Sequence, residues 1–163
     1  MTDKKYRVLI GLDRDGALIH DPGYLGRSQN WRDQVKILPG VIEGIRTLKL
    51  LPRTHLAVCS NQAGIARGFF KPNRVEEVNE HLKALLAQQG LDIDKWYFCP
   101  YVDKDYASKH HILEENPWVA ESTDLRKPGI GMLRKAADDI GMKLDDLEVV
   151  IFPILITTSE NGH

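Results

Sequence analysis

Two aspartates separated by one residue, Asp13 and Asp15, follow directly after an apolar run at residues 8–12. On an extended segment, side chains two residues apart point to the same side, so we expect both carboxylates to face one pocket and Arg14 to face away. Two ionised carboxylates about 4 Å apart repel each other by 1 to 4 kcal/mol, depending on the local dielectric. A compact site keeps both near neutral pH if a cation lies between them or if one holds a proton. The pair therefore indicates a chemical site.

The elements that position this pair alternate along the chain. Continuous apolar runs predict buried strands at residues 6–12, 55–59, 96–99 and 148–152. Apolar residues at helical spacing predict helices at residues 38–50, 73–89 and 128–140, with Asn73 able to cap the second. Residues 16–35 are expected to form a flap over the first strand end, and residues 101–124 a polar loop. Strands alternating with helices predict an α/β fold: a three-layer, Rossmann-like parallel sheet with helices on both faces.

Composition and length set limits on the function. The 163 residues suit a single domain spanning residues 1–163, and 22 basic residues nearly balance 23 acidic ones. This balance argues against a nucleic-acid or membrane partner, and no apolar run is long enough to span a bilayer. The amino terminus lacks a secretory signal, and Cys59 and Cys99 form neither a disulfide framework nor a CxxC motif. We expect a cytoplasmic monomer that acts on a small molecule.

Polar residues follow three of the predicted strands. The first strand ends at Asp13, the second ends at Ser60, and the loop after the third closes with Arg126 and Lys127. In open parallel sheets, chemistry gathers at the carboxyl ends of the strands, so an acidic pair, a hydroxyl and a basic pair should meet at one edge. Each segment alone could be an ordinary turn or a solvated surface, but the basic pair at a helix entrance also suits an anion.

Three segments, in this order and spacing, carry a family resemblance. They are Asp13-Arg14-Asp15-Gly16, the run Ser-Asn-Gln-Ala-Gly-Ile-Ala-Arg-Gly at residues 60–68, and Arg126-Lys127-Pro128. From about residue 7 to residue 147 the chain resembles the haloacid-dehalogenase superfamily, in its histidinol-phosphate and heptose-bisphosphate phosphatase branch. The resemblance implies a magnesium-dependent phosphatase that hydrolyses a small phosphorylated sugar or alcohol through an aspartyl-phosphate.

The resemblance also implies a role for each polar residue. Asp13 matches the nucleophile, and Asp15 matches the general acid that protonates the leaving oxygen. Mg²⁺ would be bound by Asp13, the Asp15 carbonyl and the phosphate. Ser60 matches a phosphate hydrogen-bond donor, Lys127 a cation that offsets charge on nucleophile and phosphate, and Arg126 a substrate contact.

Further substrate contacts are implied in the flap and after the second strand: Asp21, Pro22, Gly23, Tyr24, Asn61, Gln62 and Ala63. No large cap insertion is present, so we expect an open, capless pocket. Substrate choice would then fall to residues 21–24 and 101–124.

The sequence departs from the family pattern in two places. The fourth motif, a Gly-Asp pair with another Asp four residues later, is missing after residue 152, where Pro153 or a neighbour stands. We therefore expect a C-terminally abbreviated domain with weak metal affinity and low or absent turnover. The four zinc-ligand positions of some relatives hold Cys99, Tyr101, Thr123 and Leu125, so we expect no structural zinc.

Two alternatives to an active phosphatase remain open. One is a truncated or degenerate, non-catalytic relative that retains a phosphate-binding pocket. The other is a phospho-accepting receiver domain, which also uses acidic residues and a lysine. The segment Ser60-Asn61-Gln62 and the long flap argue against the receiver domain.

Overall fold

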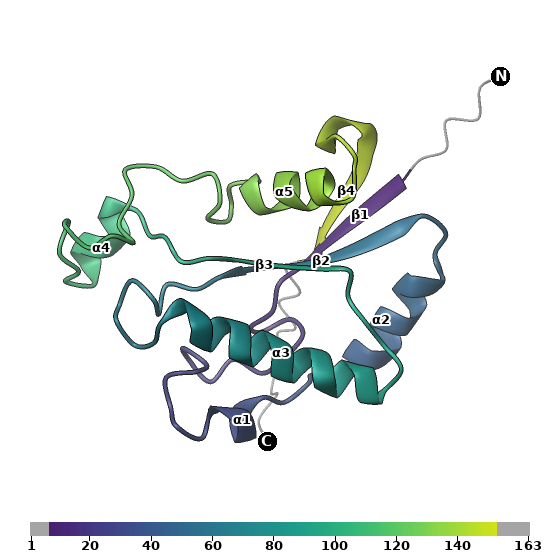
Figure 1. Cartoon of the computed structure of the whole chain (residues 1–163), viewed down its shortest axis with the longest axis horizontal. Coiled ribbons are helices and arrows are strands. Elements are labelled where there is room, and N and C mark those ends of the chain that lie inside the picture. The colour runs from purple at the N-terminus through teal and green to yellow at the C-terminus, as the bar shows by residue number, and fades with distance from the viewer. Residues whose placement is uncertain (1–6, 153–163) are drawn as a thin grey trace, which may run out of the picture.

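The computed structural model describes residues 7–152 as a sheet covered by helices on both faces (Figure 1). Four strands are all parallel and lie in the order β3-β2-β1-β4. Their bounds are β1 (Arg7–Leu12), β2 (Thr54–Asn61), β3 (Lys95–Cys99) and β4 (Leu147–Phe152). The helices are α1 (Trp31–Gln34), α2 (Val41–Leu50), α3 (Pro72–Gln88), α4 (Lys104–Lys109), α5 (Gly131–Asp139) and the 3₁₀ turn η1 (Leu144–Asp146). The predicted three-layer α/β class is confirmed.

Alternation along the strands divides the core between the two faces of the sheet. Ile10 and Leu12 pack into the larger core, which also contains Val58 and the buried side of α3. Leu9 packs into a smaller core with Ala57, Cys59 and the buried side of α5. Side chains along a strand point to opposite faces in turn. The same alternation at the end of β1 directs Asp13 toward the α5 face and Arg14 toward the α3 face.

Gly11 allows α5 to lie close to β1. A Cβ atom at this position would lie 2.8 Å from Cδ2 of Leu133, which is closer than such contacts occur. The missing side chain therefore lets α5 approach the central strand directly. This contact fixes the position of α5 beside the end of β1, and the loop that leads into α5 carries Arg126 and Lys127.

Several sequence predictions need correction. Residues 101–124 are not simply a loop, because they contain α4, whose N-cap Asp103 accepts a hydrogen bond from the backbone N–H of Tyr106 at 2.7 Å. The short helix α1 lies within the predicted flap. Asn73 does not cap α3, which begins at Pro72 after Lys71, and α5 begins at Gly131 rather than residue 128. The signal for α4 was present, since aspartate is a favoured N-cap residue.

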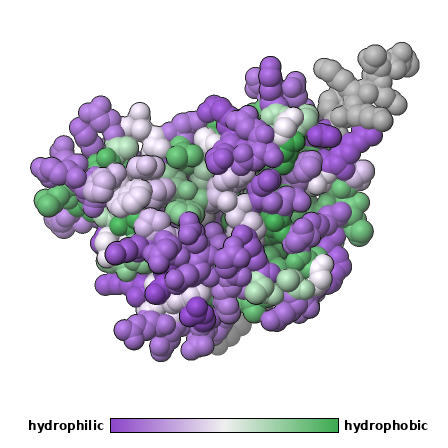
Figure 2. Space-filling view, in the orientation of Figure 1, coloured by the Kyte–Doolittle hydropathy of each residue, from purple (hydrophilic) through white to green (hydrophobic). Residues whose placement is uncertain are grey.

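The face of the molecule seen in Figure 2 is mostly hydrophilic, with apolar patches between the polar side chains. Among the side chains whose burial is described, the most exposed large apolar ones are Leu50 at 81 % and Leu113 at 75 %. Among residues 7–152, none of the helices has both the length and the apolar character that crossing a bilayer requires. The predictions about Tyr6 and about the fourth motif after Phe152 fall on residues 1–6 and 153–163, outside the described part of the chain.

Candidate active site

A cavity of about 430 Å³ lies at the carboxyl edge of the sheet. Its lining includes eleven of the twelve residues predicted for the site: Asp13, Asp15, Asp21, Gly23, Tyr24, Ser60, Asn61, Gln62, Ala63, Arg126 and Lys127. Gly64 and Tyr106 complete the lining. The remaining predicted residue, Pro22, is exposed and is not part of the lining. The structure therefore brings together segments far apart in the sequence, while the role of each residue stays a prediction.

Asp13 forms an ion pair with Lys127. Its Oδ1 lies 2.9 Å from Nζ of Lys127 and also accepts a hydrogen bond from the backbone N–H of Arg14 at 2.8 Å. The side chain of Asp13 is 33 % exposed and that of Lys127 is 29 % exposed. The carboxylate is thus both compensated in charge and reachable from the cavity.

Asp15 is held by a different cation. Nε and Nη2 of Arg14 each donate to one oxygen of the Asp15 carboxylate, both at 3.0 Å. Each aspartate therefore has its own basic partner in the protein, and the expectation of a cation between the two carboxylates, or of a proton on one of them, stays a prediction. Arg14 lies outside the cavity lining, and its guanidinium contacts the Asp15 carboxylate while also reaching Asn79 on α3.

Gln62 connects Asp15 to Ser60. Its Nε2 donates to Oδ2 of Asp15 at 2.8 Å and to Oγ of Ser60 at 2.7 Å. Ser60 and Gln62 are both buried, so the hydrogen bond between them is shielded from water. The hydroxyl at the end of β2 and the carboxylate after β1 thus share one amide donor.

Asn61 fixes the backbone of Lys127. Its Nδ2 donates to the carbonyl of Lys127 at 3.1 Å, and its Oδ1 accepts from the backbone N–H of Lys127 at 3.0 Å. This reciprocal pair ties the end of β2 to the loop before α5. Asn61 was predicted as a substrate contact, but the structure shows its amide engaged with the protein.

The outer wall of the cavity is built by aromatic and basic side chains. The hydroxyl of Tyr24 lies 3.1 Å from that of Tyr106 and accepts a hydrogen bond from Nη1 of Arg67 at 2.6 Å. Burial opposes ionisation of Tyr24, but its hydrogen bonds to Tyr106 and Arg67 and the guanidinium charge outweigh burial and lower its pKa. Burial and the hydrogen bond to Tyr24 raise the pKa of Tyr106. The sequence analysis included Tyr106 only within the range 101–124 and did not single it out, because the helix α4 that carries it was expected to be a loop.

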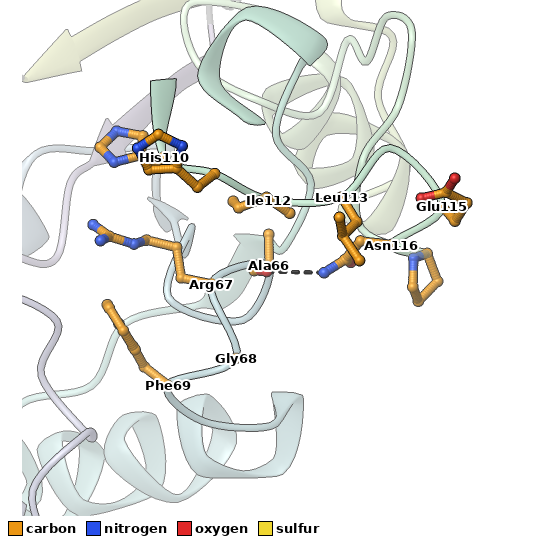
Figure 3. A pocket seen from close by; sticks show the side chains of 11 residues that line it. Ala66, Arg67, Gly68, Phe69, His110, Ile112, Leu113, Glu115 and Asn116 are labelled. Carbon is orange, nitrogen blue, oxygen red and sulfur yellow. Dashed lines mark hydrogen bonds between the residues drawn. The ribbon is translucent and has the colours of Figure 1, made fainter. Parts of the chain in front are cut away.

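A second cavity, of about 610 Å³, lies beside this wall (Figure 3). The loop after β2 forms one side of it, and the segment after α4 forms the other. Arg67 points toward the same region as His110, whereas Glu115 points away on the far side (Figure 3). Nδ2 of Asn116 donates to the carbonyl of Ala66 at 3.0 Å and joins the two segments. The sequence motifs did not indicate this cavity.

The donor atoms of the first cavity suit a hard cation. The Asp13 carboxylate and the backbone carbonyl of Asp15 are oxygen donors, and Mg²⁺ prefers oxygen ligands and keeps several waters. Within residues 7–152, no group of three or more His, Cys, Asp or Glu side chains could hold a metal ion. Of the four positions considered for zinc, Cys99 is buried, and its Sγ contacts the carbonyl of Tyr101 at 3.7 Å.

No family model matches the chain, but individual proteins do. It is 35 % identical over 152 residues to the D-glycero-beta-D-manno-heptose-1,7-bisphosphate 7-phosphatase of Haemophilus influenzae, covering 87 % of this chain and 74 % of that protein. The enzyme of the same name from Escherichia coli K12 is 33 % identical, with 87 % and 72 % covered. A D-glycero-D-manno-heptose-1,7-bisphosphate 7-phosphatase of Chlorobaculum tepidum is 32 % identical, with 94 % and 80 % covered.

Two solved structures share the fold. A D,D-heptose 1,7-bisphosphate phosphatase from B. bronchiseptica, complexed with magnesium and phosphate, has a TM-score of 0.61 and 26 % identity, covering 83 % of this chain. A HAD-like phosphatase from Mesorhizobium loti, itself described as putative, has a TM-score of 0.68 and 26 % identity, covering 90 % of this chain. The chain spans 64 % and 63 % of these two solved chains.

Proposed function

Because the chain belongs to the heptose-bisphosphate phosphatases of the haloacid-dehalogenase superfamily, which are phosphoric monoester hydrolases, we propose that it removes one phosphate from a heptose bisphosphate. The observation that carries the proposal is the ion pair between Asp13 and Lys127, 2.9 Å apart, in a cavity that also contains Asp15 and Ser60. A carboxylate, a general acid, a hydroxyl and an ammonium group are the parts that transfer of a phosphoryl group to an aspartate requires.

Asp13 is the proposed nucleophile. Among the described residues, its hydrogen bond and its ion pair both fall on Oδ1, so Oδ2 can approach phosphorus. As the bond from Oδ2 to phosphorus forms, the bond from phosphorus to the sugar oxygen breaks. The product is an aspartyl-phosphate and a dephosphorylated sugar hydroxyl. A covalent intermediate of this kind divides one difficult hydrolysis into two easier steps.

Asp15 is the proposed acid and base. It transfers a proton to the departing sugar oxygen, which would otherwise leave as a strongly basic alkoxide. The resulting Asp15 carboxylate then accepts a proton from the water that hydrolyses the aspartyl-phosphate. Both steps need the carboxyl group of Asp15 at a fixed place beside Asp13, and its hydrogen bonds to Arg14 and Gln62 hold it there.

The remaining polar groups stabilise charge on the phosphoryl group. The Ser60 hydroxyl can donate to a phosphoryl oxygen, and the Lys127 ammonium offsets negative charge on both Asp13 and the phosphate. Arg126, whose Nη1 donates to the carbonyl of Tyr101 at 3.3 Å, keeps further N–H groups for the substrate. Mg²⁺ bound by the Asp13 carboxylate and the Asp15 carbonyl would add positive charge at the transferring phosphoryl group.

The experiment is a phosphate-release assay with magnesium, using a heptose bisphosphate and p-nitrophenyl phosphate as substrates. We expect hydrolysis of both, with Asp13→Asn as the inactive control. Release no faster than that of Asp13→Asn would contradict the proposal. In that case, calorimetric binding of inorganic phosphate would support the alternative of a non-catalytic, phosphate-binding relative. The monomeric state and the cytoplasmic location stay predictions from the sequence.

A further inference from the structure

A buried arginine connects the proposed general acid to a helix far away in the sequence. Arg14 is 0 % exposed, and its Nη1 donates to Oδ1 of Asn79 on α3 at 2.8 Å. Its Nε and Nη2 donate to the two oxygens of Asp15. One planar guanidinium therefore contacts the Asp15 carboxylate on one side and the Asn79 amide on another.

Asn79 is an unusual residue for its position. It is 7 % exposed and lies on the buried side of α3. The other buried side chains of this helix are aliphatic: Val75, Val78, Leu82 and Leu86. A polar group on such a face lowers stability unless it is hydrogen-bonded. The contact with Arg14 supplies that bond and gives the asparagine a function that an aliphatic residue could not provide.

The geometry of the guanidinium makes this contact directional. Arginine presents its N–H groups in a rigid plane, and a bidentate pair with a carboxylate fixes the relative orientation of both groups. A third hydrogen bond, from Nη1 to Asn79, restrains rotation of that plane. Because the plane determines where the carboxylate oxygens lie, the orientation of Asp15 depends on a residue that does not touch it.

We propose that Asn79 is a positioning residue for the general acid: it fixes the plane of Arg14, and Arg14 holds Asp15 toward the leaving oxygen. Gln62 supplies the second restraint, through its hydrogen bond to Oδ2 of Asp15. This inference rests on the proposed function, because it assigns Asp15 the transfer of a proton to the departing oxygen. It predicts that disturbing Asn79 impairs proton transfer more than it impairs attack by Asp13.

The dependence of the rate on the leaving group separates this role from a merely structural one. A sugar alkoxide needs a proton to depart, whereas p-nitrophenolate departs readily without one. We expect Asn79→Ala to lower kcat for a sugar phosphate about 10-fold and kcat for p-nitrophenyl phosphate less than about 3-fold. The first effect is smaller than the roughly 10²- to 10⁴-fold contribution of general acid catalysis because Asp15 itself is still present. Val78→Ala, which removes buried contacts from the same helix without touching Arg14, is the matched control and should lower both rates by one common factor.

A second variant guards against a failure of Asn79→Ala to fold. Asn79→Asp keeps an acceptor oxygen for Arg14 and adds a negative charge that draws the guanidinium away from Asp15. It should also lower the rate with the sugar phosphate more than the rate with p-nitrophenyl phosphate. If the Asn79 variants that fold lower both rates by the same factor, as expected for Val78→Ala, the proposal is wrong.

A double-mutant cycle tests the same connection without any turnover. Urea unfolding is measured for Asn79→Asp, Asp15→Asn and the double variant. Coupling through Arg14 should make the combined change in the unfolding equilibrium constant differ from the product of the single changes by about 5-fold, within the range seen for residues that share a partner. Additive effects would overturn the proposal. Because the cycle needs no activity, an inactive wild-type protein would count against the proposed function alone.

Discussion

The two cavities at the carboxyl edge of the sheet are built in different ways. In the candidate active-site cavity, the Asp15 carboxylate is held by a buried arginine and a buried glutamine, and Ser60 is 2 % exposed. In the second cavity, Arg67 is partly exposed and donates to the hydroxyl of Tyr24, and its guanidinium stacks on the ring of Phe69, 4.7 Å from its centroid. Buried, multiply bonded side chains give a fixed geometry, whereas exposed cationic side chains adapt. The comparison indicates that the hydrogen bonds around Asp15 and Ser60 are more rigid than those around Arg67.

The largest effect on activity is expected from a substitution of Asp13, the proposed nucleophile. Asp13→Asn should lower phosphate release at least 10³-fold, because an amide cannot form the aspartyl-phosphate. The free energy of unfolding should change by less than about 1 kcal/mol, since the ion pair with Lys127 is partly exposed. Phosphate release and urea unfolding measure the two effects. Residual activity above one tenth of the wild-type rate, on the order of 1 kcal/mol in the barrier, would refute the role of Asp13.

The next effect concerns the cation beside the nucleophile. Lys127→Met keeps much of the side-chain volume but removes the charge, and it should lower kcat/KM about 10²-fold, as expected for loss of one charge-stabilising group. Lys127→Arg should recover part of that loss, because it restores the positive charge. Steady-state kinetics with p-nitrophenyl phosphate measures kcat/KM for the two variants and the wild-type protein. Equal rates for Lys127→Met and the wild-type protein would show that the ion pair is only structural.

A smaller effect is expected from a substitution of Asn61, which holds the backbone of Lys127. Asn61→Ala removes both hydrogen bonds to the backbone of Lys127, so we expect kcat to fall about 10-fold and stability to fall by about 1 to 2 kcal/mol. The loss of activity should not exceed that of Lys127→Met. Kinetics and urea unfolding of the two variants give the comparison, and a greater loss in Asn61→Ala would indicate a direct substrate contact instead.

The smallest effect on activity is expected in the second cavity. Arg67→Met should change kcat for p-nitrophenyl phosphate less than about 3-fold, because Arg67 lies outside the catalytic lining and a surface substitution has small effects. The pKa of Tyr24 should rise, since the guanidinium and its hydrogen bond lower it in the wild-type protein. Ultraviolet titration of tyrosinate in the variant and the wild-type protein tests the direction. If Arg67→Met lowered the rate with p-nitrophenyl phosphate as much as Lys127→Met does, the proposal that only the first cavity is catalytic would be wrong.

Local patterns predicted the strands and much of the candidate site. The continuous apolar run before Asp13 predicts a buried strand whose carboxyl end lies next to that aspartate. The apolar run before Ser60 predicts β2 and its carboxyl end in the same way. Parallel strands bring their carboxyl ends to one edge, so Ser60 and Lys127, which lie 47 and 114 positions after Asp13 in the sequence, are predicted beside it. The alternating pattern also determined that Asp13 and Arg14 would point to opposite faces.

Only the tertiary structure decided which polar groups pair. Lys127 forms an ion pair with Asp13 and Arg14 forms one with Asp15, and local sequence patterns predict neither pairing. The hydrogen bond between Arg14 and Asn79 joins residues that lie 65 positions apart in the sequence. The short helix α4 brings Tyr106 to the cavity, although its own sequence resembles a polar loop. Periodicity reports which side of an element is buried, because burial repeats with the backbone. It carries no information on side-chain partners from distant segments, which depend on how the packed helices and the sheet place them.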